Sequence, residues 1–427
     1  MIYIVINLAG LFGVLTLSRA IYKRTKTLVT FASAFSLVWG ISLLVNMTYA
    51  DGLLRVSTST LVVLYGAWWA LLAGALVILY LPLGPLNARA EIARRRALYA
   101  LGFLLAANAC ALYFDLGVGV AIRSTSLSEL TSDLAIARIE GELLGTSPPL
   151  LLGMFRYAYV LYIPLLSIMW RNKWIKTPWF VAICAASGIA CLTHFTRAPL
   201  VGLLVVLFVS LVVAFPERRS KFLRWGAVLT GAFVVLFISM QMLLAGQERQ
   251  TEEAFNDSLA AYCGGPMKAY DLLVKGEYPA QRGLYSMDMI NYVFHRMGLI
   301  RTYPSLVREE VEVPFRTNVY TFLDAFTLDF GTLGGVLGAF GIGGLVAVFY
   351  RAAGPKKYFG TTAYCLTTYY LVMAGMNNEF IRFDFPMFVM LAWLIQLVIC
   401  PLPRRHGGSG SDSLRVGRSA VGATPLS

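Results

Sequence analysis

The sequence predicts an all-α, polytopic integral membrane protein of about eleven transmembrane helices, with one long helical loop on the extracytoplasmic side. The first reason is composition: of 427 residues, 58% are apolar and 14% are charged, whereas soluble domains have about 45–50% apolar and about 25% charged residues. The second is a series of eleven apolar stretches, most of them about as long as a bilayer crossing requires. The third is that loops rich and poor in Lys and Arg alternate between these stretches.

The apolar stretches divide the chain into four regions. Residues 1–244 carry eight of them, residues 245–317 form the long extracytoplasmic loop, residues 318–400 carry the last three, and residues 401–427 form a Gly/Ser-rich tail that predicts a disordered cytoplasmic end. The first stretch has its basic residues after the apolar run, so we expect it to stay in the membrane rather than to be cleaved as a signal peptide. The eleven stretches are residues 1–18, 28–47, 60–81, 97–118, 149–170, 178–194, 199–215, 223–244, 318–350, 359–376 and 385–400.

Most of the net charge of +13 lies in alternate loops. The loops and the tail on one side contain 22 of the 36 Lys and Arg residues and only three acidic residues, Glu91, Glu217 and Asp412. The positive-inside rule makes these segments cytoplasmic, which puts the N-terminus outside and the C-terminus inside. The basic surplus therefore indicates topology, and we expect the lipid bilayer, and no nucleic acid, as a partner.

Cysteine and glycine patterns predict neither a metal site nor a nucleotide fold. Five of the six cysteines lie in apolar stretches and only Cys263 lies in an outer loop, so we expect no disulfide framework, no metal site and no cofactor. Gly331 with Gly335, and Gly334 with Gly338, have the small-xxx-small spacing that is typical of close helix packing. Because no strand precedes this run, it does not predict dinucleotide binding.

The long loop contains a segment with helical periodicity. Apolar residues recur there at intervals of three and four: Leu284, Met287, Ile290, Phe294 and Met297. This spacing predicts an amphipathic helix. Its apolar face is expected either to lie along the membrane surface or to pack on neighbouring helices.

Ionisable residues in or beside the apolar stretches are candidates for function, because a charge at the centre of a membrane helix costs about 2.5–3.5 kcal/mol on insertion scales. Those predicted near the outer membrane face are Arg156, His194, Arg197, Arg316, Asp324, Asp329, Glu379, Arg382 and Asp384. They do not form a path through mid-bilayer, which disfavours an ion-coupled transporter. Arginines under a helical loop favour a phosphate or diphosphate head group, since guanidinium groups form bidentate bonds with phosphate oxygens.

Each of these candidates also has a simpler interpretation. Arg156 and Arg382 are alternatively expected to reach toward lipid head groups, and Arg382 to pair with Asp384 or Glu379. Arg197 lies at a corner with almost no loop and His194 precedes it by three residues, so His194 is either a base beside Arg197 or an ordinary structural group.

Asn318 and Asp329 are eleven residues apart, which puts them within about 20° of each other on one face if the helix is continuous. They are then expected to line one cavity. The alternative for Asn318 is that it caps backbone groups at the start of a helix.

Three strings of the sequence resemble the O-antigen polymerase (Wzy) family of oligosaccharide repeat-unit polymerases. The most specific is VPFRTNVYTFLDAFTLDFGTLGG, residues 313–335, which is similar to the family's TNxYT...DFGxxG pattern. YCGGPMKAYDLL, residues 262–273, resembles the family's aromatic and Gly-Pro stretch in the long loop, and FTRAPLVGLL, residues 195–204, resembles its small-residue and Arg corner. With the span count and the long loop before the ninth span, the resemblance covers most of the chain.

The resemblance implies a GT-C-like glycosyltransferase in a bacterial inner membrane, with its active site facing the periplasm. It implies transfer of a growing chain from undecaprenyl diphosphate to the non-reducing end of a fresh undecaprenyl-diphosphate-linked oligosaccharide, without a cofactor. It also implies a polysaccharide chain-length regulator as a partner.

The resemblance likewise implies roles for particular residues. Arg197 and Arg316 are expected to stabilise the charge of the departing diphosphate. The full expected catalytic set is Arg197, Arg316, Asn318, His194 and Asp329, and the expected substrate-binding set is Arg282, Arg156, His295, Tyr320 and Arg382. Relatives on the ligase side have a His-Asn pair where this chain has Thr317 and Asn318, so the proton acceptor stays open among His194, His295, Asp324 and Asp329.

Other functions stay open at the level of the sequence. One is an O-antigen ligase or another polyprenyl-linked glycosyltransferase, which the missing His in FRTNVYT disfavours. Another is a flippase for lipid-linked oligosaccharides, which predicts internal repeats and polar residues along a path through the bilayer that this sequence does not show. A third is a membrane scaffold without chemistry.

Overall fold

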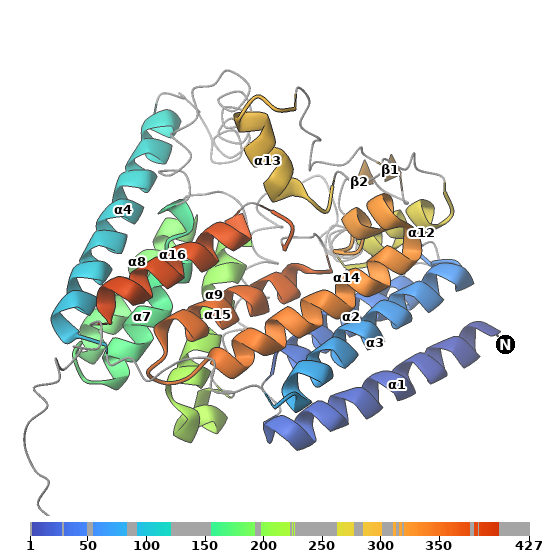
Figure 1. Cartoon of the computed structure of the whole chain (residues 1–427), viewed down its shortest axis with the longest axis horizontal. Helices are drawn as coiled ribbons and strands as arrows, with labels where there is room; N and C mark the ends of the chain where they lie inside the picture. Colours follow the sequence, from blue (N-terminus) through green and yellow to red (C-terminus); the bar gives the residue numbers. More distant parts are fainter. Residues whose placement is uncertain are drawn as a thin grey trace, which may run out of the picture.

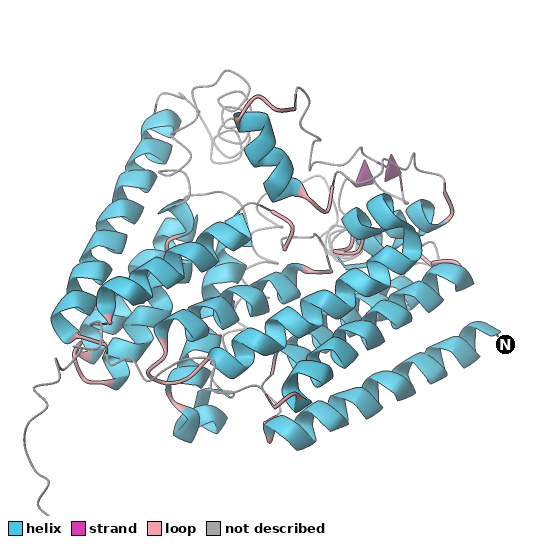
Figure 2. Cartoon of the chain, viewed as in Figure 1, coloured by secondary structure: helices cyan, strands magenta, loops and turns pink. Residues whose placement is uncertain are grey.

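The computed structural model describes residues 2–27, 30–48, 54–82, 92–120, 155–192, 198–222, 224, 226, 263–276, 285–300, 311–312, 316–317, 320–375, 380–382 and 384–400. These residues are almost entirely helical, with one short two-stranded ribbon (Figure 2). The helices gather in one bundle, with α1 and α4 along opposite edges (Figure 1).

The first half of the chain contributes α1 (Ile2–Thr25), α2 (Phe31–Thr48), α3 (Thr58–Tyr80), α4 (Arg94–Val120), α7 (Tyr159–Arg171), α8 (Thr177–Leu192) and α9 (Ala198–Ala214). The single turn η2 (Phe155–Tyr157) precedes α7, and η3 (Pro216–Arg218) follows α9. The second half contributes α12 (Gly265–Val274), α13 (Asp288–Arg296), β1 (Val311–Glu312), β2 (Arg316–Thr317), α14 (Asp324–Ala352), α15 (Tyr358–Met373) and α16 (Asp384–Ile399).

Ten of the eleven predicted apolar stretches coincide with these helices, which confirms the helical prediction for them. The stretch 223–244 lies outside the described residues, apart from Arg224 and Gly226. Five described helices, α1, α2, α3, α14 and the Arg94–Tyr113 part of α4, are long and apolar enough to cross a membrane. A sixth span results if α9 and residues 216–222, which meet at a bend of 107°, count together. The count of about eleven spans stays a prediction.

The centre of the bundle is a close crossing of α3 and α14. A Cβ atom on Gly343 of α14 would lie 1.9 Å from the Leu71 carbonyl oxygen, and one on Gly74 of α3 would lie 2.1 Å from the Phe340 carbonyl oxygen. Only glycine permits two helix backbones to approach this closely. On the other side of α3, Trp69 Nε1 donates to the Gly10 carbonyl of α1 at 2.9 Å.

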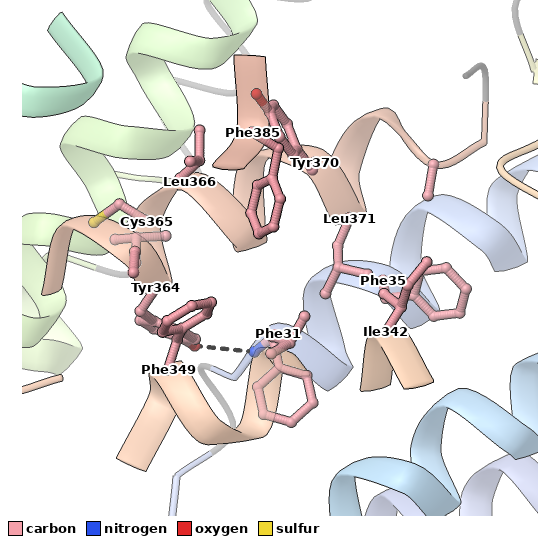
Figure 3. Packing of buried hydrophobic residues seen from close by; sticks show 14 of the residues in the cluster. Phe31, Phe35, Ile342, Phe349, Tyr364, Cys365, Leu366, Tyr370, Leu371 and Phe385 are labelled. Carbon is pink, nitrogen blue, oxygen red and sulfur yellow. Dashed lines mark hydrogen bonds between the residues drawn. The ribbon is translucent and has the colours of Figure 1, made fainter. Parts of the chain in front are cut away.

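α15 forms much of the buried core, with α2, α7, α9, α14 and α16 packed around it. Figure 3 shows Phe31 and Phe35 of α2 beside side chains of α14 and α15, with Phe385 near Tyr370. The Phe31 N–H donates to the Tyr364 hydroxyl oxygen at 3.1 Å. The buried hydroxyl of Thr368 donates to a carbonyl one turn earlier, at 2.8 Å, so this polar group is satisfied within its own helix.

At one end of the bundle, the basic end, arginines at helix termini bond to neighbouring helices. Arg24 of α1 donates to the Leu79 carbonyl of α3 at 3.0 Å, and Arg351 of α14 donates to the nearby Ile78 carbonyl at 2.8 Å. Arg171 of α7 donates to a carbonyl at the end of α9. These contacts offset the negative ends of the helix dipoles.

The opposite end is the loop end, where α2 finishes and where α3 and α14 begin. Asn46 near the end of α2 donates to the Leu54 carbonyl before α3. The Phe322 N–H before α14 donates to the Ala374 carbonyl after α15 at 3.0 Å. The helix ends thus gather at two opposite ends of the bundle, in agreement with the alternation of basic and other loops in the sequence. The assignment of the basic end to the cytoplasm stays a prediction.

Candidate functional site at the loop end

α12 is attached to the start of α3 through one buried carboxylate. Asp271 is fully buried and accepts hydrogen bonds from Ser57 N at 2.9 Å, Ser57 Oγ at 2.5 Å and Thr60 Oγ1 at 2.6 Å. Ser57 is the N-cap of α3, and its side chain accepts from the Thr60 N–H. The carboxylate therefore lies at the positive end of the α3 dipole, which favours its ionised form.

Two lysines balance the charge of this carboxylate. Lys275 Nζ lies 2.9 Å and Lys268 Nζ 3.5 Å from Asp271 Oδ2. Burial by itself would raise the pKa of Asp271, but hydrogen bonds from Ser57, Thr60 and Lys275 outweigh it and lower the pKa to about 2. Asp271 is therefore ionised at neutral pH, with its carboxylate bonded to Ser57, Thr60 and Lys275.

The neighbouring residue attaches α12 to a second helix. Tyr270 is buried, and its hydroxyl oxygen lies 2.8 Å from Thr327 Oγ1 of α14. A Cβ atom on Gly335 would lie 3.3 Å from the same hydroxyl, so the glycine leaves room for the tyrosine. α12 thus bridges α3 and α14, as Figure 1 shows at the loop end.

α14 is interrupted at Gly331, which has φ 71° and ψ −175°. This conformation is accessible to glycine and strained for other residues. After the break the chain folds back on itself: a Cβ atom on Gly338 would lie 2.6 Å from the Phe326 ring. In a continuous helix, residues this far apart in sequence are separated by about 18 Å.

Two expectations that assumed a continuous helix are corrected by this break. α14 begins at Asp324 rather than at residue 318, so the eleven-residue relation does not put Asn318 and Asp329 on one helical face. Gly334 and Gly338 make room for the first turns of the same helix, whereas Gly335 makes room for Tyr270 of α12 as expected and Gly343 makes the close contact with α3. The physical reason is that a positive φ at Gly331 redirects the backbone.

Asp329 connects the bent start of α14 to the long loop. Its carboxylate accepts from Tyr285 N at 3.1 Å, Ser286 N at 2.6 Å and Ser286 Oγ at 2.5 Å. A carboxylate with three such donors is well suited to hold the segment before α13 in place. This geometry favours a positioning role for Asp329 over the expected role of proton acceptor.

Arg316 lies on β2, which pairs with β1 in an antiparallel ribbon that puts Glu312 opposite Arg316. The ribbon lies against α12. Tyr320 is buried against Ala269 of α12, and Val311 of β1 packs on the same pair. Parts of two strings that resemble the polymerase family, residues 262–273 and 313–335, therefore lie side by side.

Three other predicted residues lie on described elements away from this ribbon. Arg156 is half-buried in η2, whose carbonyls accept from Asn108 Nδ2 of α4 at 2.7 and 3.1 Å. Arg382 forms an ion pair with Asp384 at 3.5 Å, in agreement with the expected local pairing. His295 is exposed on α13.

The remaining predicted residues cannot be placed next to these. Arg197, His194, Arg282 and Asn318 lie outside the described residues, as does the side chain of Arg316. The tail 401–427 and most of the loop 245–317 lie outside them too.

The described part of the loop end forms an ordered surface at the helix ends. Asp271 attaches α12, Asp329 attaches the segment before α13, and β2 carries Arg316 beside α12. The backbone of β2 thereby carries a cationic residue at this end of the bundle, and a guanidinium group suits an anionic head group. Within the described ranges no group of three His, Cys, Asp or Glu residues is arranged to hold a metal ion.

Sequence reasoning missed Tyr270 and Asp271 although it singled out the string that contains them. Lys268 and Lys275 lie three residues before and four residues after Asp271, a helix spacing that indicates local ion pairing. Nothing local, however, predicts that Ser57, 214 positions earlier, is the principal partner.

Comparisons of the chain with protein-family models, curated proteins and solved structures found no match. The resemblance to O-antigen polymerases therefore rests on the residues of the three strings, and the function that it implies is a proposal.

Proposed function

We propose that the protein polymerises undecaprenyl-diphosphate-linked oligosaccharide repeat units into O-antigen or a related surface polysaccharide. The observation that carries the proposal is that α12, from the string 262–273, packs on both β2 and the start of α14, from the string 313–335. Their contact at the loop end supports a common site.

The proposed reaction is a glycosyl transfer at the periplasmic face of a bacterial inner membrane. The non-reducing-end hydroxyl of a lipid-linked unit attacks the anomeric carbon of the growing chain. The bond between that carbon and the diphosphate oxygen breaks, and undecaprenyl diphosphate leaves with the electron pair. The hydroxyl proton passes to a base in the site or to the departing diphosphate.

Negative charge grows on the leaving diphosphate, so fixed cations lower the barrier of this reaction. We assign this role to Arg316 and Arg197, with Arg282 as a third cation. Arg316 belongs to the ribbon that lies on α12, and α12 is attached to two helices through Tyr270 and Asp271. These attachments would keep the cation in place while charge develops.

Other roles in the proposal follow the family resemblance. His194 and Asn318 are assigned to proton transfer and to orientation of the acceptor hydroxyl. Arg156, His295, Tyr320 and Arg382 are assigned to contacts with the lipid-linked oligosaccharides. The five or six helices that are long enough to cross a membrane provide the bilayer setting that a polyprenyl carrier needs.

The test is complementation of a strain that lacks this protein, with the surface polysaccharide separated on a gel. Wild type, Arg316→Ala and Arg197→Ala are compared at matched membrane levels. Arg55→Ala is the control, because Arg55 is an exposed arginine at the same end whose guanidinium lies 3.9 Å from the Tyr3 ring centroid. We expect a full ladder for wild type and Arg55→Ala, and a single repeat unit on an intact core for the other two.

Each other outcome has a definite meaning. If deletion of the gene also removes the single-unit band, the polymerase function is wrong and a flippase or ligase takes its place. If both alanine variants restore the full ladder, the assignment of Arg197 and Arg316 is wrong while the function stands. If Arg55→Ala behaves like Arg316→Ala, the effect is one of general charge and not of the site.

A further inference from the structure

α13, in the long loop, exposes apolar side chains and buries polar ones. Its apolar side chains are exposed, with Met297 66% and Phe294 43% accessible, and Met287 and Ile290 are similarly exposed. Two polar side chains in its first half are buried instead, Asp288 at 2% and Asn291 at 7% accessible, whereas His295 near its end is exposed. A helix bathed in water has the opposite arrangement, with polar residues outside and apolar residues inside.

The two kinds of residue occupy different sides of α13. At about 100° per residue, Met287, Ile290 and Phe294 fall within an arc of about 60°. Asp288 lies about 130° from the middle of this arc and Asn291 about 70° from it, on one flank of the helix, and both are buried. Figure 1 shows α13 apart from the main bundle, between the end of α4 and α12, so the apolar side is not covered by a neighbouring described helix.

The segment before α13 lies beside the break in α14. Residues 332–352 continue α14 beyond its break and, at 1.5 Å per residue, cover about 31 Å, close to the thickness of a hydrocarbon core. If this part of α14 spans the core, the break at Gly331 lies at its edge. Asp329 lies two residues before the break and accepts hydrogen bonds from Tyr285 N and Ser286 N, directly before α13. The exposed apolar side of α13 therefore begins next to the end of the apolar part of α14.

We propose that α13 is an interfacial helix that inserts the side chains of Met287, Ile290, Phe294 and Met297 among the phospholipid acyl chains of the outer leaflet. The buried polar side of the helix then faces the loop end, and Asp329 fixes its N-terminal end at the membrane surface. α13 acts as an anchor that holds the long loop against the bilayer. The proposal does not depend on the polymerase function.

The test is site-specific photo-cross-linking in phospholipid vesicles. The photoreactive residue p-benzoylphenylalanine replaces Phe294 in one variant and Tyr292 in a second, since these aromatic residues are about 200° apart on the same helix. The vesicles contain phosphatidylethanolamine and phosphatidylglycerol with a labelled acyl chain, and no polyprenyl lipid. A third variant carries the photoreactive residue at Phe12 of α1, which is highly exposed and sets the scale for a lipid-facing position.

We expect labelled lipid on the Phe294 variant at a level close to that of the Phe12 variant, and about tenfold less on the Tyr292 variant. Equal labelling at positions 292 and 294 would overturn the assignment of one face. An adduct at position 294 with a second copy of the chain would identify a self-association surface instead. An adduct within the same chain would show that another segment covers this face, and both results would exclude the lipid anchor.

Discussion

Replacement of Asp271 by asparagine tests how α12 is held at the loop end. Asparagine has nearly the same shape, so the perturbation removes charge without creating a cavity. The variant keeps one carbonyl acceptor for Ser57 and Thr60, but Lys268 and Lys275 lose the charge that they pair with. We expect α12 to open more readily while the membrane helices stay folded.

The magnitude follows from the pKa of Asp271. The hydrogen bonds lower this pKa from 3.8 to about 2, and each unit is equivalent to about 1.36 kcal/mol of preference for the charged form. The ionised carboxylate therefore stabilises α12 by about 2 kcal/mol at neutral pH.

The assay is amide hydrogen exchange of peptides covering residues 265–274, in wild type and Asp271→Asn in the same lipid discs. A loss of this size predicts about 30-fold faster exchange of the α12 amides in the variant. The control is Asp384→Asn, which removes an ion pair between partly exposed groups and should leave α12 exchange unchanged.

The sign of the pH dependence provides a second check. Because the folded-state pKa of Asp271 is lowered, its contribution is fully present above the ordinary pKa of about 4 and is lost only as the pH falls toward 2. The ratio of exchange rates, measured at matched pH, should therefore be the same at pH 7 and pH 5. A ratio below about threefold, or a ratio that shrinks between pH 7 and pH 5, would refute the conclusion that ionised Asp271 holds α12 in place.

Three further predictions concern α14. Gly343→Ala should lower the stability in detergent by about 1–3 kcal/mol, because the added Cβ would meet a carbonyl of α3. Gly341→Ala is the control and should leave the stability unchanged, because the space around Gly341 is open. Equal effects of the two substitutions would contradict the close crossing of α3 and α14. Gly331→Ala and Gly331→Asn should each cost about 1–3 kcal/mol, because φ 71° with ψ −175° is a conformation that is essentially restricted to glycine; an unchanged melting temperature for Gly331→Ala would argue against the break. Tyr270→Phe and Thr327→Val should show a coupling of about 1 kcal/mol in a double-mutant cycle, and strict additivity would contradict their hydrogen bond.

The positions of most helices follow from the sequence to within a few residues. α15 spans Tyr358–Met373 where the apolar stretch is 359–376, and α16 spans Asp384–Ile399 where it is 385–400. The reason is local: in a bilayer the backbone has to bond within its own segment, so a long apolar run has few alternatives to a helix.

The start of α14 was harder to predict because other segments decide it. The apolar pattern begins at residue 318, but the helix begins at Asp324. Phe322 lies before the helix and packs into the core instead. Its ring contacts Phe35 and Trp39, and its N–H donates to the Ala374 carbonyl. These partners lie on α2 and after α15, so no local pattern could indicate them.

At the candidate site, too, the sequence predicted one part and the tertiary structure decided the other. Asp329 was singled out from the sequence because an acid beside a membrane span is costly, and that cost is relieved by three donors from the loop. The role of Asp329 as a fixed acceptor depends on where Tyr285 and Ser286 lie. Asp271 was missed because its donors come from the start of α3.

The sequence by itself determined the helical membrane class, the segments that form helices and the grouping of their ends, because hydrophobicity and charge act over a single segment. Only the tertiary structure decided that α14 breaks at Gly331, that α12 bridges α3 and α14, and that α13 turns its apolar side outward. Each of these features depends on which distant segments approach one another. Asp271 and Ser57, 214 positions apart, show the reason: a buried charge is stable only where its partners converge in space.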